Sequence, residues 1–167
     1  MRLVLPSSLL AAACASACAS APPPPTAVPA EQAAPLPALS YPLRDGGTWD
    51  SAAQAGKVVV IDVWASYCLP CKHSFPHLND LAADPTVAVL GLSVDEDDAA
   101  VDAFLAEVPA RFPIGRDRTQ TVEAAPLGIH KLPTVLVVDA AGRVRLRLDE
   151  PRASDYAALP AVIAAIR

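Results

Sequence analysis

The chain has 167 residues, of which 19% are charged and 18 are proline, and its formal net charge is −5. This length suits one domain of ordinary size, and an acidic balance without a Lys/Arg cluster argues against a nucleic-acid partner. The four cysteines are Cys14, Cys18, Cys68 and Cys71. Because the presumed domain holds a single pair, the pattern indicates a catalytic dithiol and not a disulfide scaffold.

Residues 1–17 have the features of a lipoprotein-type signal peptide. One Arg precedes a small, apolar stretch that is too short and too broken for a membrane span. Small residues precede Cys14 and Cys18, similar to the lipobox in which a bacterial lipoprotein is lipidated. We favour Cys18, since cleavage there leaves no stray thiol in an oxidising compartment, with Cys14 as the alternative. Ordinary signal-peptidase cleavage near Ala19 or Ala21, or an uncleaved Ala-rich start, remains open.

Residues 18–42 are rich in proline and alanine, including the run at 22–25. Proline disfavours helix and central strand, so we expect a disordered, extended linker that tethers the domain of residues 43–167. Behind a lipid anchor, such a tether would hold the domain off the membrane surface.

The first half of the domain alternates strands and helices. Residues 48–49 begin a short strand, and the run 57–63 predicts a buried central strand with one polar residue, Asp62. A helix is expected from Leu69 to about Ala83, kinked at Pro76. A second buried strand covers 86–94, and an acidic segment at 95–98 starts a helix that ends before Pro109.

The second half predicts a hairpin and a closing helix. A short extended piece at 112–114 and a short helix at 119–125 precede a buried strand at 133–139. A turn at 141–142 leads to a half-exposed strand at 144–148. The last helix is capped by Ser154 or Asp155, and Pro160 is a candidate break within it. This order predicts an α/β fold with a mixed central sheet covered by helices.

The pair Cys68 and Cys71 forms a CxxC motif between a predicted strand and a predicted helix, an arrangement typical of thiol–disulfide exchange. Cys68 at the helix start is the expected nucleophile, and Cys71, one turn inward and less exposed, resolves the mixed disulfide. A static disulfide is the alternative, although so short a loop gains little from closure. His73 and His77 raise a zinc or copper alternative, but they follow along an outer helix face, so we predict no metal.

Residues 64–72, Pro76 and 132–134 resemble the thioredoxin superfamily. With 56–59, 93–95, 128–129 and 138–144, the chain over about 43–166 is most similar to membrane-anchored TlpA/ResA-type thiol-disulfide oxidoreductases. This resemblance implies a thioredoxin-like fold, a periplasmic or other extracytoplasmic location, and reduction of client protein disulfides, such as those of apocytochromes in cytochrome c maturation. It implies no cofactor beyond the redox-active Cys68–Cys71 disulfide. We expect a monomer that receives electrons from a separate membrane partner.

The resemblance also assigns roles around the dithiol. Asp62 lies where thioredoxins carry a buried Asp that serves the resolving cysteine as a general base, whereas many TlpA/ResA-type proteins have Asn there. A strand-edge Asp62 facing solvent is the alternative. Pro133 matches the family's cis-proline, which aims the Leu132 backbone at the client. Trp64 and Tyr67 are expected to flank the dithiol and shape its surface.

Three other activities on this fold compete with a reductase. A disulfide oxidase or isomerase would use the same pair of cysteines. A thiol peroxidase would need a lone peroxidatic cysteine with Thr three residues upstream, where this chain has Ala65. A copper-binding chaperone is the non-redox alternative.

Overall fold

A computed structural model describes residues 22–167, and its core is one five-stranded sheet with the strand order β5-β4-β3-β6-β7. Strands β3, β4 and β5 are parallel, whereas β6 and β7 run antiparallel to their neighbours. The sheet strands are β3 (Val58–Trp64), β4 (Val87–Ser93), β5 (Ile114–Arg116), β6 (Thr134–Val138) and β7 (Val144–Asp149). The predicted mixed sheet of an α/β fold is therefore confirmed.

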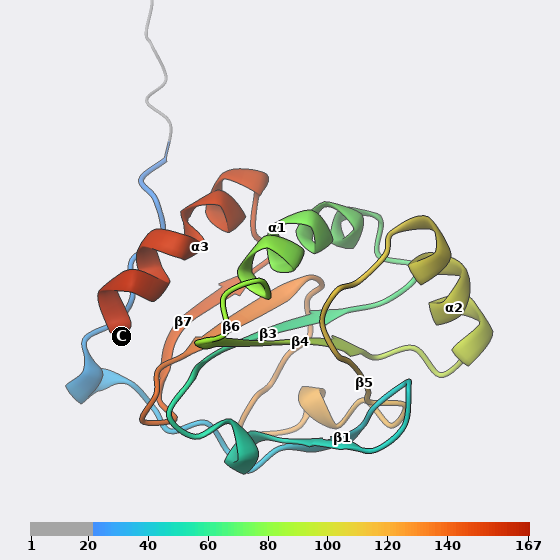
Figure 1. Cartoon of the computed structure of the whole chain (residues 1–167), viewed down its shortest axis with the longest axis horizontal. Coiled ribbons are helices and arrows are strands. Elements are labelled where there is room, and N and C mark those ends of the chain that lie inside the picture. Colours follow the sequence, from blue (N-terminus) through green and yellow to red (C-terminus); the bar gives the residue numbers. More distant parts are fainter. Residues whose placement is uncertain (1–21) are drawn as a thin grey trace, which may run out of the picture.

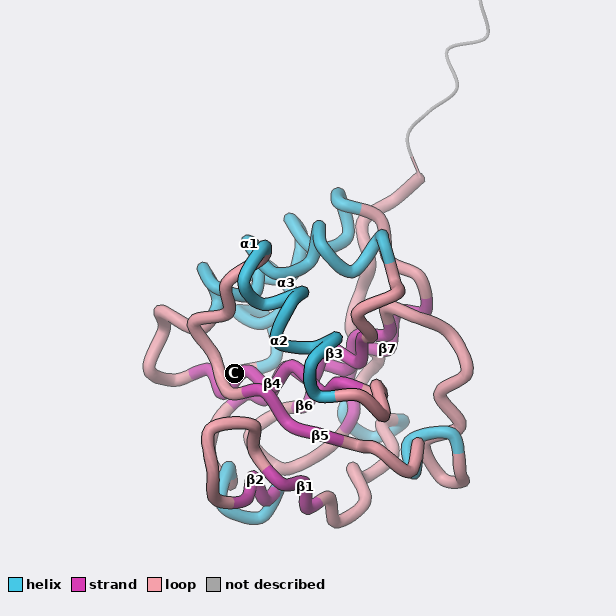
Figure 2. The backbone as a smooth tube through the Cα atoms, turned by 90° about the vertical axis from the view of Figure 1, so that its right-hand side faces the viewer, coloured by secondary structure: helices cyan, strands magenta, loops and turns pink. Residues whose placement is uncertain are grey.

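Helices and a small hairpin cover the two faces of this sheet. Helices α1 (Ser74–Leu81), α2 (Asp98–Glu107) and α3 (Ala153–Ile166) lie on one side, as Figures 1 and 2 show. The hairpin of β1 (Ser40–Pro42) and β2 (Thr48–Asp50) lies on the other side, with the short 3₁₀ turns η2 (Ser51–Gln54) and η4 (Thr121–Glu123). Both faces of the central strands are thus excluded from water.

Strand β3 is the centre of the sheet because its β-branched residues can pack on both faces. All seven of its residues are buried, and it pairs with β4 on one side and β6 on the other. Neighbouring Gly91 in β4 leaves room for an aromatic ring, since a Cβ there would lie 2.8 Å from the Phe112 Cε2 atom. The carboxyl end of β3 leads directly to the cysteine motif.

The helix that follows the motif differs from its sequence prediction. Residues Leu69–His73 form a 3₁₀ helix, η3, and the α-helix α1 begins only at Ser74. Pro76 is therefore the third residue of α1 and causes no internal kink. In a first turn the backbone N–H has no intrahelical acceptor, so proline costs little there.

Two later predictions are also corrected. The short helix expected at 119–125 is reduced to the η4 turn. Helix α3 continues through Pro160 without a break and starts after Arg152, whose backbone N–H donates to the Asp155 side chain. Asp155 thus caps the helix from its third position, and packing of the buried face holds the helix together past the proline.

Part of the predicted linker contacts the domain. The Val28 N–H donates to the Arg145 carbonyl, the Leu36 N–H donates to the Gly142 carbonyl, and η1 (Ala30–Gln32) lies between them. The segment therefore runs along β7 upstream of the predicted boundary at residue 43, and Figure 1 shows it entering beside α3. The signal peptide of residues 1–17 and the lipidation candidates Cys14 and Cys18 lie outside the described residues. Within residues 22–167, no helix has the length and apolar character needed to cross a bilayer.

Candidate active site

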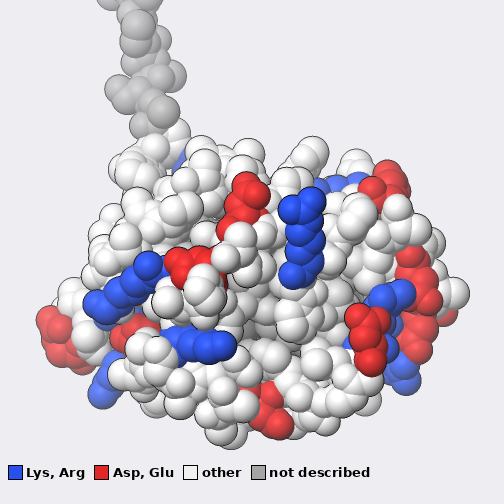
Figure 3. All heavy atoms as spheres, in the orientation of Figure 1, with Lys and Arg blue, Asp and Glu red and all other residues white. Residues whose placement is uncertain are grey.

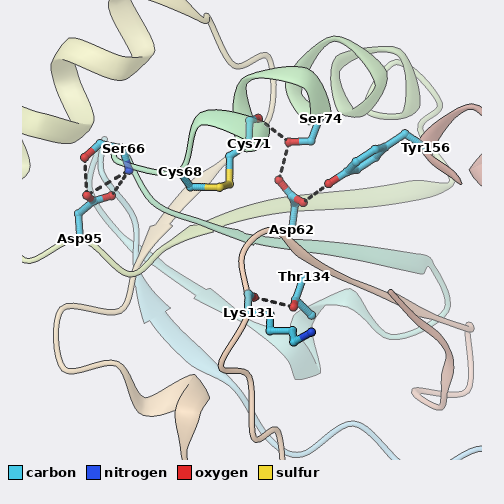
Figure 4. The surroundings of a disulfide bond; sticks show 9 residues. All are labelled: Asp62, Ser66, Cys68, Cys71, Ser74, Asp95, Lys131, Thr134 and Tyr156. Atoms are coloured by element: carbon cyan, nitrogen blue, oxygen red, sulfur yellow. Dashed lines mark hydrogen bonds between the residues drawn. A yellow bond between two sulfur atoms is a disulfide. The ribbon is translucent and has the colours of Figure 1, made fainter. Parts of the chain in front are cut away.

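A disulfide joins Cys68, at the end of the loop that follows β3, to Cys71 in η3, with the two Cα atoms 5.4 Å apart. Cys68 is the N-cap residue of η3. It is the more exposed of the two cysteines, with 7% of the residue exposed against 0% for Cys71. Figure 4 shows the bond spanning the first turn of η3. An attacking sulfur can therefore reach Cys68 before Cys71, which fits the order expected of a nucleophile and a resolving thiol.

A buried carboxylate fixes the turn that precedes Cys68. Asp95 accepts from the Ser66 N–H at 2.9 Å, from the Ser66 Oγ at 2.6 Å and from the Ser93 Oγ at 2.8 Å. Charge-assisted hydrogen bonds of this kind are stronger than neutral ones, so Asp95 holds the loop in one conformation. Figure 4 shows this cluster beside Cys68, on the side away from Asp62.

Asp62 lies on the other side of the disulfide and is fully buried. Its Oδ2 accepts from the Ser74 Oγ at 2.9 Å, and its Oδ1 accepts from the Tyr156 hydroxyl at 3.1 Å. Burial raises the pKa of the Asp62 carboxyl from 3.8 to about 7, although both hydrogen bonds oppose the shift. The solvent-facing alternative is therefore excluded, and the carboxyl can hold or release a proton near neutral pH.

The loop before β6 forms the third side of the site. The Leu132–Pro133 peptide bond is cis, as the sequence predicts, and a second cis bond precedes Pro126. Tyr67 is 73% exposed and lies with Leu132 at a hollow of about 280 Å³. Valine and isoleucine side chains make up the apolar part of its wall: Val63, Val94, Val122 and Ile129. The hollow thus lies between Tyr67, the residue before Cys68, and Leu132, the residue before the cis-proline.

Trp64 was expected on the same surface, and that expectation is wrong. Its side chain is fully buried, with its ring centroid 5.1 Å from that of Phe75 and 4.5 Å from that of Phe104. As the last residue of β3, Trp64 points into the layer beneath α1 and α2. It therefore supports the motif from below and offers no contact to a client.

Comparison with known proteins gives the family. The Redoxin family model matches residues 30–159, which is most of the chain. The chain belongs to the Redoxin family. This Redoxin-family chain is 32% identical over 92 residues to the thiol-disulfide oxidoreductase ResA of Bacillus thuringiensis, covering 53% of each chain. It thus spans about half the length of that relative.

Two further similarities extend over more of the Redoxin-family chain. It is 31% identical over 148 residues to ResA of Geobacillus thermodenitrificans, covering 87% of this chain and 83% of that protein. The crystal structure of a protein described as the thiol:disulfide interchange protein DsbE of Chlorobium tepidum is 30% identical, with a TM-score of 0.74, covering 80% of this chain and 96% of that one. The chain is therefore of the ResA/DsbE type with a thioredoxin-like fold.

Sequence reasoning missed the partners of Asp62 in this Redoxin-family site. Ser74 follows Cys71 by three residues, a spacing that could have placed both on one side of a helical turn. Tyr156 is 94 residues away from Asp62 and carried no local signal. Its position depends on how α3 packs over β3, which only the tertiary structure gives.

The two histidines that raised a metal alternative do not gather with the cysteines. His73 is exposed, whereas the ring of His77 stacks on Tyr156 at a centroid distance of 5.9 Å. Over the described part of the chain, no three His, Cys, Asp or Glu side chains converge in a way that could hold a metal ion. The donor set for a zinc or copper site is thus not assembled among residues 22–167.

Proposed function

We propose that this chain is an extracytoplasmic thiol-disulfide oxidoreductase that reduces disulfides of client proteins through Cys68 and Cys71. The observation that carries the proposal is a disulfide between Cys68, which is 7% exposed, and the fully buried Cys71, with a titratable carboxyl behind the same turn. The relatives named thiol-disulfide oxidoreductase and thiol:disulfide interchange protein support the same reaction class.

The proposed reaction begins from the reduced dithiol. The Cys68 thiolate attacks a client disulfide, so one client sulfur leaves as a thiolate and a mixed disulfide forms. Asp62 in its ionised form accepts the proton of the Cys71 thiol, and the Cys71 thiolate attacks the Cys68 sulfur. The second client sulfur then leaves as a thiolate, and protons from Asp62 and water give the client dithiol. Two electrons pass to the client, and the chain is left with its Cys68–Cys71 disulfide.

The direction toward reduction rests on the surroundings of Cys68. A CxxC protein that is a strong oxidant stabilises the thiolate of its nucleophilic cysteine. In this chain the neighbouring Leu69 is 70% exposed, and its side chain offers no hydrogen bond to the Cys68 sulfur. Lys72, the nearest cation in sequence, is bound to Glu107 at 2.6 Å. The buried Asp62 carboxyl supplies a base for the resolving step, which speeds release of the client from the mixed disulfide.

The remaining parts of the proposal concern place and partners. After removal of the leader of residues 1–17, a lipid on Cys18, or else on Cys14 after an earlier cleavage, would anchor a monomer to the membrane through its tether. A separate membrane protein would return electrons to the disulfide. Figure 3 shows acidic and basic side chains interspersed on one face, a pattern unlike a nucleic-acid-binding surface. Comparing the Cys18→Ser and Cys14→Ser variants for membrane fractionation and lipid labelling tests the anchor, which fails if neither variant changes either property.

Trapping tests the reaction. With Cys71→Ser, the mixed disulfide between Cys68 and a disulfide-bonded polypeptide such as insulin should accumulate, because the resolving thiol is missing. The matched Cys68→Ser variant should form none, since the buried Cys71 cannot reach the client. Equal adduct formation by both variants, or no reduction of insulin by the wild-type dithiol, would refute the proposed activity.

A further inference from the structure

Two hydroxyl groups are the only side-chain partners of the buried Asp62 carboxyl within residues 22–167. Ser74, the first residue of α1, is fully buried, and Tyr156 in α3 is 2% exposed. Each reaches a different carboxyl oxygen, at 2.9 Å for Ser74 and 3.1 Å for Tyr156. Figure 4 shows the carboxyl pointing between them, under the turn that carries Cys71.

The Ser74 hydroxyl faces more acceptors than it has protons. Its Oγ lies 2.9 Å from Asp62 Oδ2 and also 2.9 Å from the Cys71 carbonyl oxygen. A hydroxyl donates one hydrogen bond and accepts up to two. The Cys71 carbonyl additionally accepts the Ser74 backbone N–H, so it keeps a donor when the hydroxyl turns away.

Both charge states of Asp62 can therefore be satisfied without moving a heavy atom. When the carboxyl is ionised, Ser74 and Tyr156 each donate to one oxygen. When it is neutral, its Oδ2–H donates to the Ser74 Oγ, whose own proton turns to the Cys71 carbonyl, and Tyr156 still donates to Oδ1. A buried polar group left without a partner would be costly, and here neither state leaves one.

We propose that Ser74 is a two-position hydrogen-bond switch and Tyr156 a constant donor, and that together these positioning residues allow Asp62 to change its charge inside the core. The inference rests on the proposed function, in which Asp62 takes up and releases one proton in each exchange cycle. Because Ser74 belongs to the turn of Cys71, each change of charge is coupled to the hydrogen bonding of the resolving cysteine's backbone.

The other described groups that pack around the carboxyl are apolar or are bonded elsewhere, so the two hydroxyls remain as its hydrogen-bond partners. Strands β4 and β6 present Gly91 and Val135 opposite Asp62, and the Cys71 thiol is held in the disulfide. From α1, His77 stacks on the Tyr156 ring at a centroid distance of 5.9 Å. From α3, Asp155 is bonded to Arg152. Burial raises the pKa of Tyr156 far above its usual value, so the phenol remains protonated and keeps its donor role.

Infrared titration of the oxidised protein tests the switch. The C=O band of the neutral carboxyl, identified by its absence in Asp62→Asn, should disappear in the wild type with a midpoint at about pH 7. Tyr156→Phe and Ser74→Ala should each raise the midpoint by about one pH unit, because each removes a donor that favours the charged form. In Ser74→Ala the band should also move to higher frequency, since the carboxyl O–H loses its acceptor.

Matched controls separate this role from packing. Tyr41→Phe removes another buried phenol hydroxyl, bonded to Thr121, and Ser51→Ala removes the hydroxyl that accepts the Leu39 N–H. Both control variants should leave the midpoint unchanged. Ser74→Thr keeps the hydroxyl, so its midpoint should be that of the wild type and not the raised value of Ser74→Ala. An unchanged or lower midpoint in Tyr156→Phe would overturn the inference even if Ser74→Ala does not fold. Because no client is present, failure of the exchange assay and failure of this titration are independent results.

Discussion

Replacing Asp62 by asparagine should remove a pH-dependent destabilisation of the fold. The carboxyl titrates at about 7 in the folded chain and near 3.8 when unfolded, since burial disfavours its charge. A folded-state pKa above the unfolded value means that stability is fully present below pH 3.8 and is lost as pH rises through 7. The difference of about 3.2 units, at 1.36 kcal/mol per unit, corresponds to about 4 kcal/mol.

Asparagine imitates the neutral carboxyl, because its amide can donate to Ser74 and its oxygen can accept from Tyr156. Urea unfolding of the oxidised protein at several values between about pH 4 and pH 8.5 measures the effect. The stability of Asp62→Asn relative to the wild type should grow by about 4 kcal/mol across this range. Asp80→Asn, at an exposed position of α1, is the control. Parallel curves for the wild type and Asp62→Asn would refute the buried, titrating carboxyl.

Three further variants test other parts of the account. Gly91→Ala places a Cβ 2.8 Å from the Phe112 ring, so thermal or urea unfolding should show a loss of about 1–3 kcal/mol, and an unchanged midpoint would contradict the packing. Asp95→Asn weakens the hydrogen bonds that hold the turn before Cys68, so hydrogen exchange there should accelerate; unchanged protection would argue against the anchor. Replacing exposed Tyr67 and Leu69 by alanine should slow reduction of insulin but not of a small linear disulfide such as oxidised glutathione, and equal slowing of both would exclude a client-docking role.

The parts of the fold that follow from local pattern could be predicted from the sequence. The apolar run of β3 and the spacing of Cys68 and Cys71 place the motif at a strand end, and Leu132-Pro133-Thr134 places the proline loop. Helix starts and stops were less accurate, because Pro76 and Pro160 are tolerated for different reasons: one lies in a first turn, and the other lies in a helix held by its buried face.

Contacts between distant segments lay beyond sequence reasoning. Tyr156 reaches Asp62 across 94 positions, and Asp95 reaches Ser66 across 29. The burial of Trp64 likewise depends on how the rings of α1 and α2 gather over the sheet, not on its place beside the motif. For the same reason, the proline content of the linker predicted an extended chain but could not predict the hydrogen bonds that this chain makes with β7.

The reduction potential of the Cys68–Cys71 pair tests the proposed direction of electron flow most directly. Equilibration with glutathione or dithiothreitol buffers, followed by quantification of the oxidised and reduced chain, gives this value. The account predicts a reducing potential, nearer to the roughly −270 mV of thioredoxin than to the roughly −120 mV of a strong oxidant. A value close to that of the strong oxidant would contradict a reductase and identify the pair as a disulfide donor.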